Sequence, residues 1–280
     1  MADPRFDRGR FAARLGSGRL GCNVRVLAET GSTNDETWAA AEAGAADGLV
    51  IVAEAQTRGR GRAGRSWNTV PGKSLALSVL MRHAAAPSGL AALPLAAGLA
   101  VARALERLGA APALKWPNDV LLEERKVAGV LCESRHAARA PSFPPGPRSQ
   151  AEDGAFPVVI GVGVNVSQGP GDFPPELAGT ATSLAMAGIV TDRETVAAGF
   201  LNELEGLWLV LRSGGQADVL AQWSARARFW GRPVVVRTPA GEVRGTARAL
   251  DADGALVLAG PDGAALAVRA GDLWAAGEEA

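Results

Sequence analysis

The feature that most constrains the fold of this chain is a change of pattern at Gly231. Up to about residue 230, stretches with helical periodicity alternate with apolar, strand-like runs. Beyond that point, turns such as Pro-Ala-Gly and Asp-Gly separate short β segments at residues 234–238, 242–250, 255–260 and 264–270. This pattern predicts an α+β fold with two domains, a mixed sheet with helices over residues 1–230 and a small β-barrel over residues 231–280.

The first predicted domain carries clear start and stop signals for helices. Thr33 followed by Glu36 fits a capping box with Gly44 as the stop, and Thr191 followed by Glu194 fits a second capping box. The predicted helices are residues 30–44, 88–109, 191–215 and 216–228. The predicted strands are residues 49–55, 74–81, 113–116, 120–123, 126–134 and 157–166. Residues 135–157, rich in Pro, Ala and Ser, are predicted to form a surface insertion.

Composition narrows the possible functions. The chain has 280 residues, of which 48% are apolar, and its 29 basic and 29 acidic side chains balance, which argues against a general polyanion binder. No signal-like apolar core and no membrane-spanning run occurs, so we expect a cytoplasmic protein without a membrane partner. Cys22 and Cys132 form neither a disulfide framework nor a metal-ligand set, and the two histidines lie far apart, so we expect no metal site made by the protein.

The most distinctive motif is QTRGRGRAGRSW, residues 56–67, called here the arginine loop. Its arginines offer forked donors to phosphate or carboxylate oxygens, and its glycines let the backbone approach a ligand. A short arginine–glycine segment also suits single-stranded nucleic acid. However, this one joins two predicted core strands, which favours a loop that closes over an anionic intermediate. Trp67 offers a flat face to a nucleobase, and the ending of a Walker loop is missing.

Three further stretches carry candidate site residues. Lys115 ends a strand just before the Pro-Asn-Asp turn of KWPND, a position that suits a fixed cation, although the turn residues fit an ordinary hairpin equally well. The hydroxyls of GSTND, residues 31–35, either cap a helix or bind a polar ligand at the same helix start. Asn165 ends an apolar strand with glycines at positions 161 and 163, where another group can approach the backbone closely.

In this order, the motifs resemble those of the biotin–protein ligases (biotin–[acetyl-CoA-carboxylase] ligases). The resemblance rests on GSTND, AEAQTRGRGRAGRSW, LKWPNDVLL, KVAGVLCES and VVIGVGVNV. It implies a core like that of class II synthetases, followed by an SH3-like barrel. It also implies an ATP-dependent ligase that makes biotinyl-5′-adenylate and transfers biotin to a lysine of a biotin carboxyl carrier domain.

The resemblance also implies roles for single residues, with Lys115, Arg60 and Arg62 as the catalytic ones. The implied biotin site is Ser32, Thr33, Asn34, Gln56, Gly59, Arg60, Arg62, Lys115 and Gly129. The implied ATP site is Arg62, Arg65, Trp67, Lys115 and Asn165, with Mg²⁺ held mainly through ATP. Arg58 and Arg65 are expected to position the loop, and Trp274 to lie in the barrel core. The carrier domain is the expected partner, and a homodimer is compatible with the sequence.

Some members of the family also repress transcription through an N-terminal winged helix. Only 31 residues precede Ser32, so we expect no DNA binding. Two rival functions remain. A lipoate or octanoate ligase of the same fold would carry Arg-Arg, Gly-Gly-Gly and His-Asp patterns that this chain lacks. A non-enzymatic nucleic-acid-binding protein is disfavoured by the balanced charge.

Overall fold

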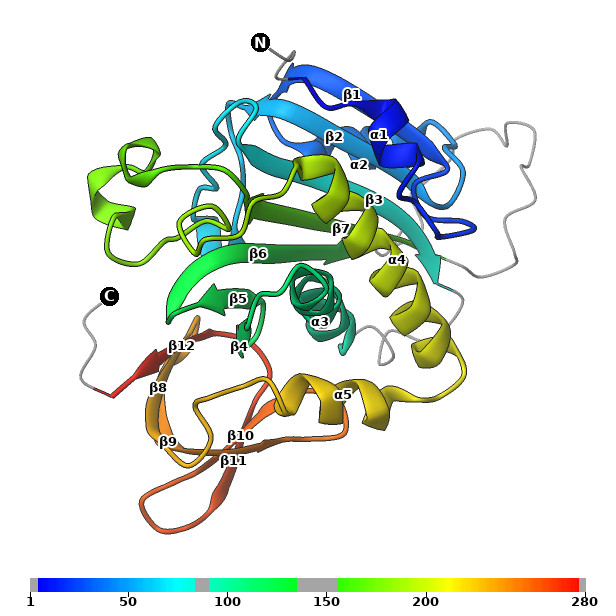
Figure 1. Ribbon diagram of the computed structural model, residues 1–280. Coiled ribbons are helices and arrows are strands. Elements are labelled where there is room, and N and C mark those ends of the chain that lie inside the picture. The colour runs from blue at the N-terminus through cyan, green and yellow to red at the C-terminus, as the bar shows by residue number, and fades with distance from the viewer. Residues whose placement is uncertain (1–4, 84–90, 135–155, 277–280) are drawn as a thin grey trace.

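The computed structural model describes residues 5–83, 91–134 and 156–276, and these form two β-sheets with flanking helices (Figure 1). The strands are β1 Asn23–Thr30, β2 Leu49–Gln56, β3 Ser74–His83, β4 Ala113–Lys115, β5 Asp119–Leu122, β6 Arg125–Ser134, β7 Phe156–Asn165, β8 Pro233–Thr238, β9 Gly241–Leu250, β10 Leu256–Ala259, β11 Ala265–Val268 and β12 Asp272–Ala275. The helices are α1 Arg8–Ala12, α2 Thr33–Glu42, α3 Leu93–Glu106, α4 Arg193–Arg212 and α5 Gln216–Ser224. The predicted α+β class is confirmed.

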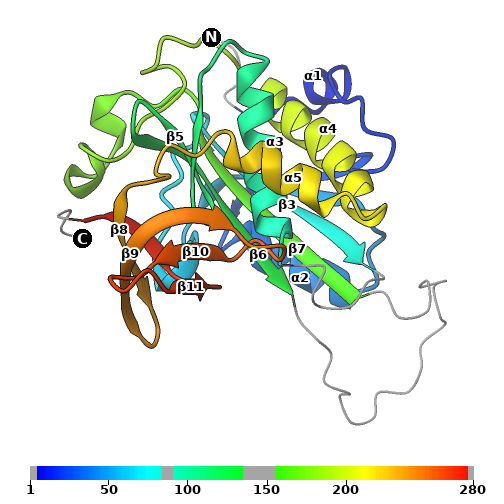
Figure 2. The same cartoon turned by 90° about the horizontal axis from the view of Figure 1, so that it is seen from below.

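The first sheet has seven strands in the order β1-β2-β3-β7-β6-β5-β4, and it separates two apolar layers. β1 and β2 are parallel, whereas the other neighbours are antiparallel. Alternate residues of a strand point to opposite faces. Val50 and Val52 of β2 therefore join the core under α3 and α4, while Leu49 and Ile51 pack with Trp38 of α2. Figure 2 shows α3 and α4 on one side of the sheet and α2 on the other.

The start of α2 differs from its prediction. The capping box at Thr33 is wrong, because the residue at the N-cap is Ser32 and its side chain makes no capping hydrogen bond. Glu36 turns instead to β1, where its carboxylate accepts a hydrogen bond from the Thr30 hydroxyl at 2.7 Å. The hydroxyls at this helix start are therefore not used as caps and stay available for other contacts.

The start of α4 also differs, by one residue. Asp192 is the N-cap instead of Thr191, and its carboxylate accepts the Thr195 backbone N–H at 2.7 Å. Glu194 is not part of a capping box, because its carboxylate accepts the Asp7 backbone N–H at 2.7 Å. A contact with a distant segment has replaced the local one that the sequence suggested.

Most other boundaries follow the prediction. The predicted strands are shifted by no more than two residues at either end. The helices are shorter: α3 covers residues 93–106 of the predicted 88–109, and α5 covers residues 216–224 of the predicted 216–228. Almost all of the predicted insertion lies outside the described residues. In the part of the chain that is described, no helix combines the length and apolarity needed to cross a membrane.

The second sheet supplies the small C-terminal β unit, in the order β11-β10-β9-β8-β12. Its last strand, β12, was not predicted; it pairs antiparallel with β8, so the end of the unit returns to its beginning. The prediction that Trp274 lies in the barrel core is wrong. Leu273 is the core residue of β12, whereas Trp274 is half-buried and faces a cleft between the two sheets. Trp116 joins the sheets, because its indole N–H donates to the Gly254 carbonyl at 3.2 Å.

Candidate active site

A cleft of about 680 Å³ is lined by the start of α2, the end of β2, the arginine loop, the β4–β5 hairpin, β6, β7 and β12. These segments come from both sheets and from most of the chain. The cleft brings together the predicted site residues Ser32, Thr33, Asn34, Gln56, Arg60, Arg62, Arg65, Trp67, Lys115, Gly129 and Asn165. Of the predicted site residues, Gly59 alone is outside this lining.

The floor of the cleft is formed by two glycines of β7. Because Ile160 points into the core under α3 and α4, Gly161 and Gly163 face the opposite side, which carries α2. A Cβ atom on Gly161 would lie 2.1 Å from the Asn34 side chain, and one on Gly163 would lie 2.1 Å from the Trp67 ring. The predicted close approach at these glycines is confirmed, and the approaching groups are side chains of the cleft wall.

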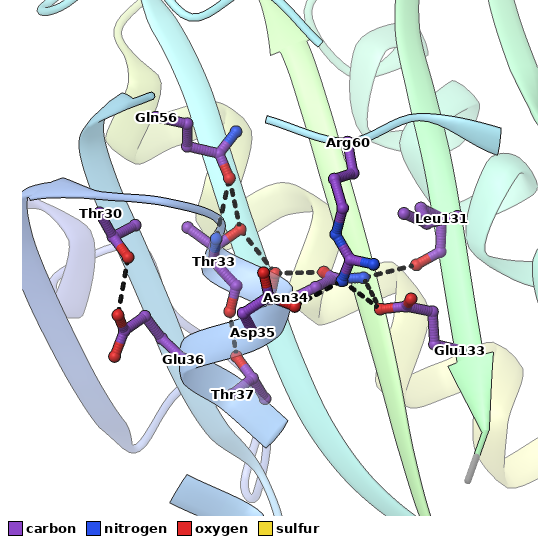
Figure 3. Close-up of polar contacts among 11 residues, drawn as sticks. Thr30, Thr33, Asn34, Asp35, Glu36, Thr37, Gln56, Arg60, Leu131 and Glu133 are labelled. Carbon is purple, nitrogen blue, oxygen red and sulfur yellow. Dashed lines mark hydrogen bonds and ion pairs between the residues drawn. The ribbon is translucent and has the colours of Figure 1, made fainter. Parts of the chain in front are cut away.

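Polar side chains at the start of α2 line part of the cleft, and Figure 3 shows the contacts that connect them. The side-chain amide oxygen of Gln56 accepts a hydrogen bond from the backbone N–H of Thr33 at 2.8 Å. The Ser78 hydroxyl lies 2.7 Å from the Thr33 hydroxyl and 2.6 Å from the Asn34 carbonyl oxygen. Together with Ser32, these buried donors and acceptors suit a small, neutral ligand that has both N–H and C=O groups.

The arginine loop folds back on itself. Arg60 and Ser66 form an isolated antiparallel bridge, and the Trp67 N–H donates to the Gly59 carbonyl at 2.8 Å. A Cβ atom on Gly59 would lie 2.3 Å from the Trp67 carbonyl oxygen, so the turn of the loop itself requires the glycine. The predicted packing of Gly59 against biotin is therefore not supported by its position.

The first half of the loop is attached to the seven-stranded sheet and to α2. The Arg60 guanidinium donates to Asp35 at 2.7 Å and to Glu133 at 3.1 Å (Figure 3). The Arg58 backbone N–H donates to the Gly31 carbonyl at 2.9 Å, and its side chain lies against the same glycine, outside the cleft lining. The backbone at Arg58 thus ties the loop to the start of α2, and the positioning role of its side chain stays a prediction.

The second half of the loop is attached to the C-terminal sheet. Arg62 donates to the side-chain amide oxygen of Asn118 and to the backbone carbonyl of Gly271, both at 3.2 Å, and Arg65 forms an ion pair with Asp272. Burial lowers the pKa of Arg62 below its ordinary value, and the neighbouring carboxylate of Asp272 partly offsets this effect. The loop therefore bridges the two sheets over the mouth of the cleft.

Two lysines place ammonium groups in the cleft. Lys115 Nζ lies 4.9 Å from the centre of the Trp274 ring, and no carboxylate of the described residues comes within ion-pair distance of it. Lys126 Nζ lies 2.6 Å from Asp119 and 5.7 Å from the centre of the Trp67 ring. The sequence analysis missed Lys126. The available signal was its place at the start of the KVAGVL strand, next to the hairpin that carries Lys115.

Asn165 lines the cleft, but its amide is already bonded within the protein. Its NH₂ group donates to the Thr182 carbonyl at 2.9 Å, and its oxygen accepts a hydrogen bond from Gln168 at 2.8 Å. In contrast, the indole N–H groups of Trp67 and Trp274 are buried without an acceptor among the described residues. Unpaired buried donors are uncommon, and both of these belong to cleft residues.

The cleft lining contains five cationic side chains and the four carboxylates of Asp119, Glu124, Glu176 and Asp272. Among the described residues no carboxylate pairs with Arg62 or Lys115, so these two offer the free positive charge for a bound anion. The cations at the cleft are Arg60, Arg62, Arg65, Lys115 and Lys126. Several are held by protein carboxylates and carbonyls, so their positions are fixed before a ligand arrives, which is how fixed charges lower the barrier of a reaction that concentrates negative charge. The polar patch at the start of α2 lines the same cavity, so one ligand can use both.

Comparison with known proteins agrees with this geometry. Residues 26–142 match the "Biotin/lipoate A/B protein ligase family", and residues 229–272 match the "Biotin protein ligase C terminal domain". A biotin–[acetyl-CoA-carboxylase] ligase of Mycobacterium tuberculosis is 38% identical over 98% of this chain and 96% of its own length. An enzyme with the same name from Paracoccus denitrificans is 35% identical over 85% of this chain and 95% of its own.

A solved structure of similar shape is the biotin protein ligase of Aquifex aeolicus in complex with biotin and ATP. Its TM-score is 0.72 at 26% sequence identity, and the match covers 90% of this chain and 98% of the other. The similarity in sequence and in structure extends across both sheets. This chain therefore belongs to the biotin protein ligase family.

Proposed function

We propose that this protein is an ATP-dependent biotin ligase that transfers biotin to a lysine of a biotin carboxyl carrier domain. In the first step, a carboxylate oxygen of biotin bonds to the α-phosphorus of ATP while the bond to pyrophosphate breaks. In the second, the neutral amine of the acceptor lysine attacks the acyl carbon of biotinyl-5′-adenylate. AMP leaves with the bonding electrons, and the amine proton passes to solvent.

The single observation that carries this proposal is the coincidence of the cleft with the family's motifs. Five motifs that are separated in the sequence converge on one cavity, in a chain that is similar over its whole length to named biotin ligases. A lipoate or octanoate ligase fits less well, because two relatives that are matched over 95% or more of their own length carry biotin in their names. The balanced charge continues to disfavour a nucleic-acid-binding protein.

The polar patch at the start of α2 is the proposed binding site for the ring of biotin. The patch presents hydroxyl and amide groups that can bond the ureido group of biotin, from Ser32, Thr33, Asn34 and Gln56. Gly129 belongs to the same wall, where a Cβ atom would lie 3.0 Å from the Lys126 side chain and 3.3 Å from the Trp67 ring. A side chain at position 129 would therefore press on both groups that we assign to the reacting end.

The reacting end of the cleft is proposed to hold the carboxylate and the phosphates. Lys115 and Lys126 supply the fixed positive charge, and Arg60, Arg62 and Arg65 belong to the loop that excludes water from the adenylate. Trp67 is the proposed platform for the adenine ring. Asn165 shapes the wall beside the phosphates through its bonds to Thr182 and Gln168. Mg²⁺ accompanies ATP and is held mainly by its phosphate oxygens.

Other parts of the prediction remain proposals. The division into domains at residues 230 and 231 is supported by the start of β8 at Pro233. A cytoplasmic location is supported by the free cysteines Cys22 and Cys132. No general base is assigned, since an acceptor lysine that is held and desolvated beside the adenylate needs only to lose its proton to solvent. Formation of a homodimer is left to measurement.

The test is biotin-dependent exchange of labelled pyrophosphate into ATP, followed by transfer of labelled biotin to a purified carrier domain. We expect exchange with biotin, and none with lipoate or octanoate at equal concentration. An exchange signal that does not depend on biotin would refute the first step. Exchange without transfer to the carrier domain would leave the adenylation activity in place and refute the proposed acceptor.

A further inference from the structure

Glu133, near the end of β6, connects the arginine loop to the polar patch at the start of α2. Its carboxylate oxygen Oε2 accepts a hydrogen bond from the Asn34 amide at 2.7 Å and another from the Arg60 guanidinium at 3.1 Å (Figure 3). One oxygen atom thus receives a donor from each of the two parts of the cleft. The side chain is about a quarter exposed (26%) and is not part of the cleft lining.

Asn34 owes its orientation to this contact. Its NH₂ group donates to Glu133 and, at 3.3 Å, to the Leu131 carbonyl, so its oxygen is directed at the Ser78 hydroxyl. The side chain also lies directly on Gly161, which leaves no room for it to shift toward the sheet. The carboxylate of Glu133 has only acceptors, so it selects the amide rotamer in which NH₂ faces β6.

The hydrogen bonds continue from Asn34 to the far end of the arginine loop. Ser78 lies between Asn34 and Thr33, Thr33 is bonded to Gln56, and the Gln56 amide donates to the Thr69 hydroxyl at 3.2 Å. Thr69 is the second residue after the loop, and Arg60 lies near its beginning. The chain of contacts therefore runs under the proposed biotin-ring site and ties both ends of the loop to it.

We propose that Glu133 is a positioning residue that couples the biotin-ring site to the placement of the arginine loop. This inference rests on the proposed function, since it assigns the patch to biotin and the loop to the adenylate. Glu133 fixes the orientation of the Asn34 amide through one hydrogen bond and the position of the Arg60 guanidinium through another. Loss of its charge weakens both the binding of biotin and the retention of the adenylate.

Asp35 offers a matched control. Its carboxylate accepts a hydrogen bond from the same Arg60 guanidinium, at 2.7 Å, but among the described residues makes none with the Asn34 side chain, and it does not line the cleft. Asp35→Asn therefore removes one ion pair from the loop and leaves the orientation of Asn34 unchanged. A role of Glu133 as a simple loop anchor predicts equal behaviour of the two variants, whereas coupling predicts different behaviour.

The experiment compares the full-length wild-type protein, Glu133→Gln and Asp35→Asn by two measurements. The first is KM for biotin in pyrophosphate exchange, and the second is the rate at which preformed biotinyl-adenylate escapes from the enzyme. For Glu133→Gln we expect both to rise about fivefold, the factor that corresponds to about 1 kcal/mol for a partly exposed charged contact. For Asp35→Asn we expect the escape rate to rise while KM for biotin stays at the wild-type value.

A double variant separates coupling from a general loss of structure. In Arg60→Ala the loop contact is already absent, so adding Glu133→Gln should raise KM for biotin but increase adenylate escape by less than it does in the wild-type background. If the fold-increases in adenylate escape of the two single variants multiplied fully in the double variant, the inference would be overturned. An unchanged KM for biotin in Glu133→Gln would also overturn it. If Glu133→Gln lowers the melting temperature, Glu133→Asp serves instead, because it keeps the charge on a side chain one methylene shorter. It should show the same rise in KM for biotin and in adenylate escape. Absence of biotin-dependent exchange in the wild type would instead refute the proposed function.

Discussion

The two faces of the seven-stranded sheet are built in contrasting ways. On the face under α3 and α4, strand residues such as Leu77 and Ile160 are fully buried in a continuous apolar core. On the opposite face, the next residues of the same strands are Ser78 and Gly161, which meet the polar and glycine-lined cleft. The first face maximises apolar contact, whereas the second gives up part of that contact to make room for a ligand. We therefore expect substitutions on the first face to change stability and those on the second to change activity.

The largest expected effect is on the helix-covered face. Leu99 of α3 is fully buried, so Leu99→Ala should lower the free energy of unfolding by about 2–5 kcal/mol through lost contact and a residual cavity. Chemical denaturation measures the change, and KM for biotin of the folded fraction should stay the same. Leu209→Ala, at an α4 position that is 57% exposed, is the control and should be nearly neutral. Equal losses at both positions would contradict the contrast between core and surface.

Substitution of Lys115 tests the cleft face. Lys115→Ala removes a fixed cation beside the Trp274 ring, so biotin-dependent pyrophosphate exchange should fall about a hundredfold. The melting temperature should remain at the wild-type value. Lys73→Ala is the matched control, because Lys73 pairs with Asp172 and does not line the cleft. Near-normal exchange in Lys115→Ala would remove this residue from its proposed role and leave Lys126 as the main cation.

A smaller effect is expected for Arg62, which holds the loop to the C-terminal sheet. Arg62→Gly loses the hydrogen bonds to Asn118 and Gly271, so biotinyl-adenylate should escape about tenfold faster and label free amines. Biotinylation of an unrelated protein in the same tube measures the escape. Arg58→Gly makes the same replacement in the same loop but outside the cleft, and should retain the adenylate better. Equal retention in the two variants would count against closure by Arg62.

The smallest effect compares the helix starts on the two faces. Asp192 caps α4, so Asp192→Ala should cost about 1 kcal/mol of stability, whereas Ser32→Ala should cost no capping energy in α2. Burial, the largest single influence, would raise the pKa of Asp192, but the hydrogen bonds from Thr195 and the charges of Arg14 and Arg10 together hold the pKa below its ordinary value. The contribution of Asp192 is therefore complete above the pKa of the unfolded chain and is lost as pH falls through the folded value. Denaturation at neutral and acidic pH measures the loss of stability in Asp192→Ala and its pH dependence. We expect the difference in stability from the wild type to shrink toward low pH, and a difference that grew there would contradict the lowered pKa.

Much of the fold could be predicted because its signals are local. The apolar runs 49–55 and 157–166 match strands within about two residues, since a continuous apolar run reflects a strand that is buried on both faces. The helix starts were placed less well, because Thr33 and Glu194 satisfy local capping rules yet bond to Gln56 and Asp7. β12 was missed because Leu273 is its single buried residue, so burial leaves little trace in its sequence.

The candidate site was predictable where a motif named its residues and not where contacts came from afar. The motifs located Ser32, Arg60 and Lys115, all of which line the cleft. Lys126 had only the indirect signal of its place beside the Lys115 hairpin, and Trp274 had none, so the role of both depends on the packing of the hairpin and β12 beside the arginine loop. The contact of Gly59 with the backbone of Trp67 was likewise not predictable, because it depends on how the loop folds back on itself.

The sequence by itself determined the alternation of helices and strands, the C-terminal β unit and the family to which the chain is similar, because these depend on periodicity and on short motifs. The tertiary structure decided which partner each charged group has. Arg60 and Arg62 are two residues apart, yet one is held by Glu133 and the other by Gly271. Hydrogen bonds need atoms within about 3 Å, a condition that only the packing of distant strands can satisfy.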